Sequence, residues 1–199
     1  YDITDFLNAG KNALSVTVAD GWYKGKIALG KGCEYGEVPG MLMQMEIRNT
    51  DGTRTKLCSD EAFPYSFAGP IQYADLFLGE CVDARKDDGD PSEISYEAKN
   101  WEKVKTAKKD LYDFAVLTAQ TAPEIEVYAE IPASEILTTP KGETVVDFGQ
   151  NMAGTIRVEL SAKVGEEICF EHGETLDKDG NFTYAFTDTT RAQKDVYIS

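Results

Sequence analysis

Hydrophobic and polar residues alternate along most of this chain, and apolar positions with helical spacing are nearly absent. Alternation with a period of two puts every second side chain on one face, which is the pattern of a half-buried β-strand. Turn sequences such as Asp51-Gly52 and Lys141-Gly142 separate the alternating runs. Many short strands with regular turns predict an all-β chain built from β-sandwiches rather than a parallel α/β fold. The runs lie at residues 13–18, 42–48, 125–131, 143–148, 155–160, 166–171 and 195–199.

One short helix is expected at the start of the chain, in the stretch YDITDFLNAGKN. Asp2 can cap free backbone N–H groups, and Asp5 puts a negative charge where a helix N-terminus favours it. Gly10 can then end the helix in a left-handed conformation. A charged stretch at residues 92–109 lacks a clean apolar stripe, so an irregular loop with at most one helical turn is expected there.

A change of composition divides the chain into two parts. Residues 116–123 (VLTAQTAP) separate an aromatic, glycine-rich half from a regular run of hairpins. We therefore predict one β-domain over residues 1–117 and a second, truncated one over residues 118–199, which stops inside the strand-like sequence KDVYIS. Apolar residues make up 42% of the chain, enough for a packed core, and no apolar run approaches the roughly 18 residues of a membrane span.

The chain is strongly acidic, with 35 acidic and 20 basic side chains and a formal net charge of −15. Phosphate backbones and anionic lipid surfaces repel such a chain, so neither nucleic acid nor a membrane is expected as a partner. Neutral ligands such as carbohydrates are compatible with this charge, although solubility alone also accounts for it.

The cysteines are Cys33, Cys58, Cys81 and Cys169, in no C-x-x-C spacing, and a single histidine accompanies them, which argues against a zinc site. Two of them, Cys58 and Cys169, fall at apolar positions of strand-like runs, where a free thiol behaves as a small hydrophobe. We expect reduced thiols and a cytoplasmic protein. A secreted form is the alternative, because the sequence looks cut at its N-terminus.

The stretch VADGWYKGK carries Asp20, Trp22 and Tyr23 in a loop after a strand. An aromatic face stacks on the apolar C–H face of a sugar ring, and a carboxylate accepts hydrogen bonds from sugar hydroxyl groups or holds calcium. These residues are candidates for sugar binding, and Asp20 is a candidate calcium ligand. The alternative is that Trp22 plugs the end of the sandwich core.

The stretch GECVDARKDDGD supplies three further candidates for sugar binding, Glu80, Asp83 and Arg85. Asp83 and Arg85 are two residues apart, which puts them on one face of a strand, where they can pair. A salt bridge is therefore the alternative use of this pair. The acidic run that follows lacks the ligand spacing of a calcium loop and is interpreted as a solvated loop.

Two polar segments, DFGQNMAG and EHGETLDKDGN, lie beside strand-like runs in the second half. In the first, Gln150 and Asn151 can contact a ligand, but a bulged hairpin turn also explains such residues without one. In the second, His172 and Glu174 stand at a strand end, where a histidine beside carboxylates can act as a general base. No nucleophile motif accompanies them, so no catalytic residue is predicted.

A series of blocks in this chain resembles the bacterial alpha-L-rhamnosidase family of glycoside hydrolases: YDITDFLNAGKNALSV, ADGWYKG, GPIQYADLFLGECVDAR, TPKGETVVDFGQNMAGTIRVEL, HGETLDKDGN and RAQKDVYIS. The resemblance implies a jelly-roll β-sandwich over residues 1–117, followed by part of a concanavalin-like antiparallel β-sandwich over residues 118–199. In such enzymes a catalytic (α/α) barrel supplies the acid and the base of an inverting hydrolysis. Nothing in this sequence matches that barrel.

The resemblance also implies a function for the parent enzyme, the removal of terminal α-L-rhamnose from glycosides. The present segment would be inactive alone, would support the barrel, and would bind rhamnose through the jelly roll, in some members with calcium and without any required cofactor. Loop residues Gln150 and Asn151 would approach the barrel. Two alternatives are an autonomous carbohydrate-binding module and a purely structural or dimer-forming pair of sandwiches.

Overall fold

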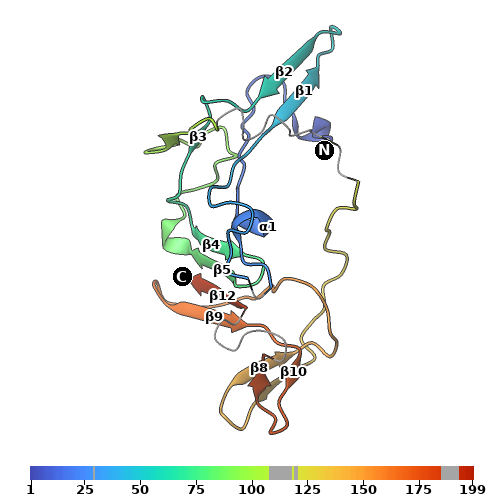
Figure 1. Cartoon of the computed structure of the whole chain (residues 1–199), viewed down its shortest axis with the longest axis vertical. Coiled ribbons are helices and arrows are strands. Elements are labelled where there is room, and N and C mark those ends of the chain that lie inside the picture. The colour runs from blue at the N-terminus through green and yellow to red at the C-terminus, as the bar shows by residue number, and fades with distance from the viewer. Residues whose placement is uncertain (29, 108–117, 119–120, 185–192) are drawn as a thin grey trace.

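The computed structural model describes residues 1–28, 30–107, 118, 121–184 and 193–199, and strands dominate this part of the chain (Figure 1). Its helical segments are α1 (Gly21–Lys24) and the 3-10 turns η1 (Thr4–Phe6) and η2 (Ala84–Lys86). None of these is long and apolar enough to cross a membrane. The strands are β1 (Gln44–Arg48), β2 (Arg54–Cys58), β3 (Pro64–Tyr65), β4 (Ile71–Asp75), β5 (Gly79–Asp83), β6 (Glu102–Lys103), β7 (Glu135–Thr138), β8 (Thr144–Asp147), β9 (Glu167–Glu171), β10 (Thr175–Leu176), β11 (Phe182–Thr183) and β12 (Lys194–Ile198).

A four-stranded sheet in the order β4-β5-β12-β9 lies in the middle of the molecule. The other described ladders are two-stranded: β1-β2, β3-β6, β7-β8 and β10-β11. In Figure 1 the β1-β2 hairpin extends at one end of the long axis, and β8 and β10 lie toward the other end. The prediction of an all-β chain is confirmed. The described ladders are antiparallel with one exception, the β5-β12 pair, which is parallel and departs from the all-antiparallel expectation.

The central sheet joins residues that are far apart in the sequence. Val196 of β12 pairs with Cys81 of β5 on one side and with Cys169 of β9 on the other. Neighbouring strands are about 4.8 Å apart, so the two thiols of this row are separated by roughly twice that distance, too far for a disulfide. The four cysteines are free. Cys81 and Asp83 are buried, so the best-covered part of the sheet is β5.

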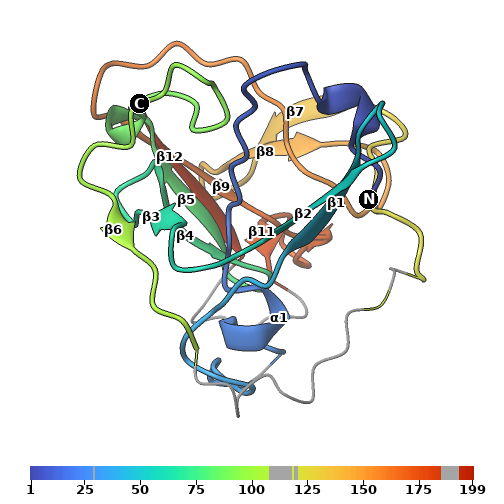
Figure 2. The ribbon, with the colours of Figure 1, turned by 90° about the horizontal axis from the view of Figure 1, so that it is seen from above.

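The predicted strands at residues 42–48, 143–148, 166–171 and 195–199 are confirmed as β1, β8, β9 and β12. The predictions for residues 13–18, 125–131 and 155–160 are wrong, because these runs form no strand. Alternation defines a face, but a strand also needs a neighbouring backbone with which to exchange hydrogen bonds. In Figure 2 the connection from β8 to β9, which contains residues 155–160, follows the periphery of the molecule.

The helix expected at the start of the chain is shorter than predicted. It is a single 3-10 turn, η1, which ends at Phe6. Asp2 accepts a hydrogen bond from the backbone N–H of Thr4 at 2.9 Å, although the N-cap position of the turn is Ile3. Gly10 has the expected left-handed conformation, with φ of 99°, but it lies beyond the end of the turn. The segment lacks the apolar spacing that would pack a longer helix onto a core.

The chain has an unusually large accessible surface of 16,562 Å². A folded monomer of 21.9 kDa exposes about 9,300 Å². Cys81 is the buried apolar residue of the described part, while Val16 and Val158 are nearly half exposed and Tyr128 is 94% exposed. Runs that form no strand therefore leave large apolar side chains that other described elements do not fully cover.

The predicted domain boundary falls in residues 116–123, of which residues 116, 117, 119 and 120 lie outside the described part. The central sheet draws β4 and β5 from before this segment and β9 and β12 from after it. The two predicted domains are therefore in direct contact through main-chain hydrogen bonds between β5 and β12.

Candidate functional site

The first group of candidates lies on α1, which the sequence had indicated as a loop. Asp20 precedes the helix, and its carboxylate forms an ion pair with the Lys24 ammonium at 3.0 Å. Trp22 is 59% exposed, and its indole meets the Phe77 ring edge-on, with ring centroids 5.8 Å apart. Tyr23 is about half exposed. Trp22 therefore contacts Phe77 at one side and faces solvent over more than half of its surface, so it does not plug a core as the alternative interpretation held.

The segment after α1 is fixed to the turn between β4 and β5. The backbone N–H of Lys26 donates a hydrogen bond to the Asp75 carboxylate at 2.7 Å. The same carboxylate accepts hydrogen bonds from the N–H groups of Phe77 and Leu78. Asp75, which the sequence analysis did not single out, therefore holds the α1 group at this end of the sheet.

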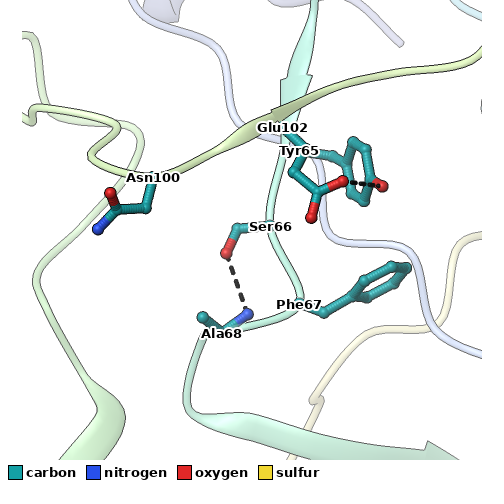
Figure 3. Close-up of a pocket in the computed structure, with 6 residues that line it drawn as sticks. All are labelled: Tyr65, Ser66, Phe67, Ala68, Asn100 and Glu102. Carbon is teal, nitrogen blue, oxygen red and sulfur yellow. Dashed lines mark hydrogen bonds between the residues drawn. The ribbon is translucent and has the colours of Figure 1, made fainter.

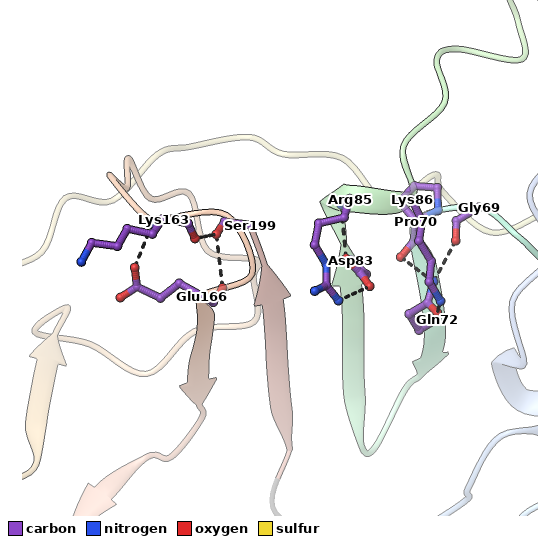
Figure 4. A network of polar contacts seen from close by, with 9 residues as sticks. All are labelled: Gly69, Pro70, Gln72, Asp83, Arg85, Lys86, Lys163, Glu166 and Ser199. Atoms are coloured by element: carbon purple, nitrogen blue, oxygen red, sulfur yellow. Dashed lines mark hydrogen bonds and ion pairs between the residues drawn. The ribbon is translucent and has the colours of Figure 1, made fainter.

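Asp83 and Arg85 form the predicted pair at the opposite end of β5 (Figure 4). Arg85 Nε and Nη2 donate to the two carboxylate oxygens of Asp83 at 2.8 Å each. Asp83 is 4% exposed, and the Arg85 hydrogen bond lowers the pKa of its carboxyl group. The pairing raises the pKa of Arg85 in turn. Because bidentate pairing occupies both oxygens of Asp83, the salt-bridge interpretation is the one that this geometry favours.

The parallel pairing of β5 and β12 brings the ends of both strands to this edge of the sheet. Ser199 follows β12, and its hydroxyl donates to the carbonyl groups of Lys163 and Glu166. A side chain added at Gly165 would come within 3.6 Å of Arg85 Nη1. The Asp83–Arg85 pair therefore lies beside the turn that precedes β9.

Glu80 is exposed and lies at the start of β5, the end of the strand near the α1 group. Its backbone N–H donates to the Asp195 carboxylate at 3.0 Å. The six sugar-binding candidates of the first half are consequently not brought into one site. The α1 group lies near the start of β5, whereas Asp83 and Arg85 lie at its end, about 13 Å further along a strand that rises about 3.3 Å per residue.

The candidates of the second half also occupy separate places. Gln150 and Asn151 are exposed after β8. The segment before them forms a turn that needs no ligand, which is the alternative given in the sequence analysis. The Asp147 carboxylate accepts a hydrogen bond from the N–H of Gly149 at 2.6 Å, and Gly149 has φ of 75°. Glu174 is exposed, two residues beyond His172.

His172 has a partner that the sequence did not indicate. Its Nε2 lies 2.7 Å from Oδ2 of Asp195, and both side chains are about one third exposed. Asp195 bonds the β5 backbone through its other oxygen, so this carboxylate connects β9, β12 and β5. A histidine held in this way serves as a contact between strands.

A pocket lies elsewhere, between the β3 segment and the β6 segment (Figure 3). It has a volume of about 300 Å³ and is lined by Tyr65, Ser66, Phe67, Ala68, Asn100 and Glu102. The Tyr65 hydroxyl donates to Oε2 of Glu102 at 3.0 Å, and this bond raises the pKa of the phenol. The sequence analysis missed these residues, although the aromatic cluster FPYSF was a signal that could have directed attention to them.

A metal centre is not evident in the part of the chain that the structure describes, where no three His, Cys, Asp or Glu side chains gather to hold an ion. Asp20, the predicted calcium ligand, has Lys24 as its closest charged partner. The calcium site therefore stays a prediction.

Two family profiles together match most of the chain. Residues 1–129 match the alpha-L-rhamnosidase N-terminal domain. Residues 137–199 match the bacterial alpha-L-rhamnosidase concanavalin-like domain.

Individual relatives agree with these matches. The alpha-L-rhamnosidase of Streptomyces avermitilis is 34% identical over 197 residues, which are 99% of this chain and 19% of that protein. The crystal structure of the Streptomyces avermitilis enzyme complexed with L-rhamnose superposes with a TM-score of 0.80 at 32% identity, covering 92% of this chain and 17% of that one. The crystal structure of the native alpha-L-rhamnosidase from Aspergillus terreus gives a TM-score of 0.75 at 26% identity. The match covers 89% of this chain and 20% of that one. This chain thus spans about a fifth of the length of these relatives.

Proposed function

Because this chain belongs to the alpha-L-rhamnosidase family, we propose that it is a non-catalytic segment of an enzyme that hydrolyses terminal α-L-rhamnose from glycosides. The segment supports the catalytic domain of the full-length protein, and it contributes sugar binding rather than bond cleavage. The hydrolysis itself proceeds with inversion, by an acid and a base that both lie in the catalytic (α/α) barrel. A cytoplasmic location accompanies this proposal, supported by the free state of the cysteines.

The uncovered apolar surface is the observation that carries the proposal. The total surface of the chain, polar and apolar together, exceeds that of a folded monomer of its mass by roughly 7,000 Å². A standard protein interface buries only about 800 Å² on each partner. Leu14, Val16 and Val18 are alternate residues of a run that forms no strand, and each is between 47% and 49% exposed. Water disfavours such a surface, so it fits a segment that packs on the rest of a longer chain.

Hydrolysis of an aryl α-L-rhamnoside by the full-length parent tests this function. We expect the parent to release the phenol and the 199-residue chain to release none. Val16→Asp in the parent places a charge on the face that is proposed to be covered. It should therefore lower, by several degrees, the temperature at which activity is lost, since burying an unpaired carboxylate costs a few kcal/mol.

Lys11→Asp is the matched control, because this position is exposed in the same segment but is not apolar. It should leave the inactivation temperature within about 1 °C, as exposed substitutions usually do. Release of phenol by the 199-residue chain alone would contradict the non-catalytic role. An unchanged inactivation temperature in the Val16→Asp parent would contradict the supporting role.

Sugar binding by an autonomous module is the second candidate function. It is favoured by the exposed faces of Trp22 and Tyr23 on α1. If the module binds sugar at α1, Asp20 would break its ion pair with Lys24 and ligate calcium. Sugar binding at α1 would then depend on the cation. That dependence distinguishes it from the site inferred below.

A further inference from the structure

The pocket between β3 and β6 combines two aromatic rings with three kinds of polar group. A two-residue ladder, Pro64 with Lys103 and Tyr65 with Glu102, holds its two sides together. The N–H of Val104 adds a hydrogen bond to the carbonyl of Phe63 at 3.3 Å. The pocket is thus built by main-chain pairing of segments that lie 37 residues apart.

The Phe67 side chain of the pocket is 88% exposed. Its ring meets the ring of Tyr65 edge to face, with centroids 5.2 Å apart and an angle of 75° between the planes. This geometry leaves much of the Phe67 ring open to solvent. A large aromatic face in water is unfavourable unless a ligand or partner covers it.

The carboxylate of Glu102 is fixed by the pocket itself. Oε2 accepts the hydrogen bond from the Tyr65 hydroxyl at 3.0 Å. The other oxygen points to the side of the pocket on which Phe67 lies (Figure 3). A carboxylate that is held at one oxygen presents the other as an acceptor for a ligand hydroxyl.

Asn100 and Ser66 supply the remaining polar groups. Asn100 has φ of 62°, a left-handed backbone that asparagine tolerates better than most residues. In Figure 3 its amide is directed away from Ser66, Phe67 and Glu102, so Asn100 lies at the margin of the pocket. The Ser66 hydroxyl accepts a hydrogen bond from the N–H of Ala68 at 3.0 Å, so its proton is available to a ligand.

We propose that this pocket binds a single neutral pyranose, with an apolar C–H face of the sugar on Phe67 and its hydroxyl groups on Glu102 and Ser66. The inference deepens the sugar-binding part of the proposed function and is independent of where hydrolysis takes place. The volume of about 300 Å³ is at the lower limit of small-molecule pockets, so it suits one ring rather than a chain of sugars. Anionic sugars are disfavoured by Glu102 and by the net charge of −15. The pocket contains one carboxylate, so the site needs no cation.

Calorimetric titration of the 199-residue chain with methyl α-L-rhamnopyranoside, in buffer containing EDTA, tests the proposal. A ligand of about a dozen non-hydrogen atoms in an open pocket is expected to bind in the millimolar range. Phe67→Ala should weaken binding at least about tenfold, because it removes the stacking surface. Glu102→Gln should weaken it by about the same factor, because it replaces a charged acceptor by a neutral one.

Two control variants match these in residue type and exposure. Phe6→Ala removes another exposed phenylalanine, which is 80% exposed on η1, and Glu97→Gln removes an exposed carboxylate of the same loop. Neither should change the dissociation constant. Methyl α-D-glucopyranoside as a second ligand tests whether the site discriminates between pyranoses.

Each outcome of the titration decides the matter. Loss of binding in Phe67→Ala and Glu102→Gln, with binding kept in both controls and in EDTA, supports the pocket. Binding that survives Phe67→Ala but disappears in EDTA or in Trp22→Ala places the sugar at α1 and overturns the inference, while the proposed function stands. Absence of heat at millimolar sugar overturns both the pocket and the sugar-binding role. The supporting role is then tested separately, by the inactivation temperature of the Val16→Asp parent.

Discussion

The central sheet and the β1-β2 hairpin differ in what holds them, although the same alternating pattern encodes both. In the hairpin, partners such as Ile47 and Thr55 come from one short stretch joined by Asp51-Gly52, and every residue of β2 is exposed. In the sheet, β5 is covered by β12, which lies 115 residues further along the chain at the Glu80–Asp195 contact. Local sequence is enough to form a hairpin, whereas burial comes only where distant strands converge.

Two glycines with nearly the same backbone conformation give the largest expected difference between the hairpin and the central sheet. Gly79 between β4 and β5 has φ of 88°, and Gly52 in the β1-β2 turn has φ of 85°. A Cβ at Gly79 would lie 2.3 Å from the carbonyl oxygen of Lys194, whereas a Cβ at Gly52 would meet nothing within 4 Å. Gly79→Ala should therefore cost about 3 kcal/mol or more in unfolding free energy, measured by urea denaturation, because strain and a backbone clash add.

Gly52→Ala is the control, since it introduces the left-handed strain without the clash. Its expected cost is about 1 to 2 kcal/mol. Equal costs for the two variants would show that β12 does not approach β5 as closely as described.

Two carboxylates, Asp195 and Asp60, give the second test, in which the expected change in unfolding free energy is of intermediate size. Asp195 accepts a hydrogen bond from Glu80 N–H at 3.0 Å and contacts His172 at 2.7 Å. Asp195→Ala should lower the unfolding free energy by about 1 to 2 kcal/mol, because two contacts between strands are lost. Asp60→Ala removes a purely local bond to the N–H of Ala62 and should stay within about 0.5 kcal/mol. A larger effect at Asp60 would reverse the comparison.

Acid titration gives the smallest expected effect and tests both regions at once. Hydrogen bonds from Arg85 lower the pKa of Asp83 in the sheet, and those from Thr53 lower the pKa of Asp51 in the hairpin. A folded pKa below the unfolded value of about 3.9 stabilises the protein above that pH, and this contribution is lost as the pH falls through the folded pKa. Carboxyl chemical shifts followed by NMR should show both groups titrating low.

Substitution of the partners assigns each shift. Arg85→Ala should raise the pKa of Asp83 alone, and Thr53→Val should raise that of Asp51 alone. A change at both carboxyl groups in either variant would mean that the two regions are coupled, contrary to the separation described.

Much of the architecture followed from the sequence by itself. The alternation of EEICFE and DVYIS determined β9 and β12, and Asp51-Gly52 determined the β1-β2 turn, because these features depend on neighbours only a few residues away. The predicted pairing of Asp83 and Arg85 is also present, although Arg85 lies in η2 rather than on the face of a strand that the spacing had suggested. The tertiary structure decided that β5 and β12 run parallel, that residues 13–18 form no strand, and that Asp195 contacts His172. It also placed Phe67 and Glu102 in one pocket, and none of this is encoded locally, because each contact depends on which distant backbone arrives alongside.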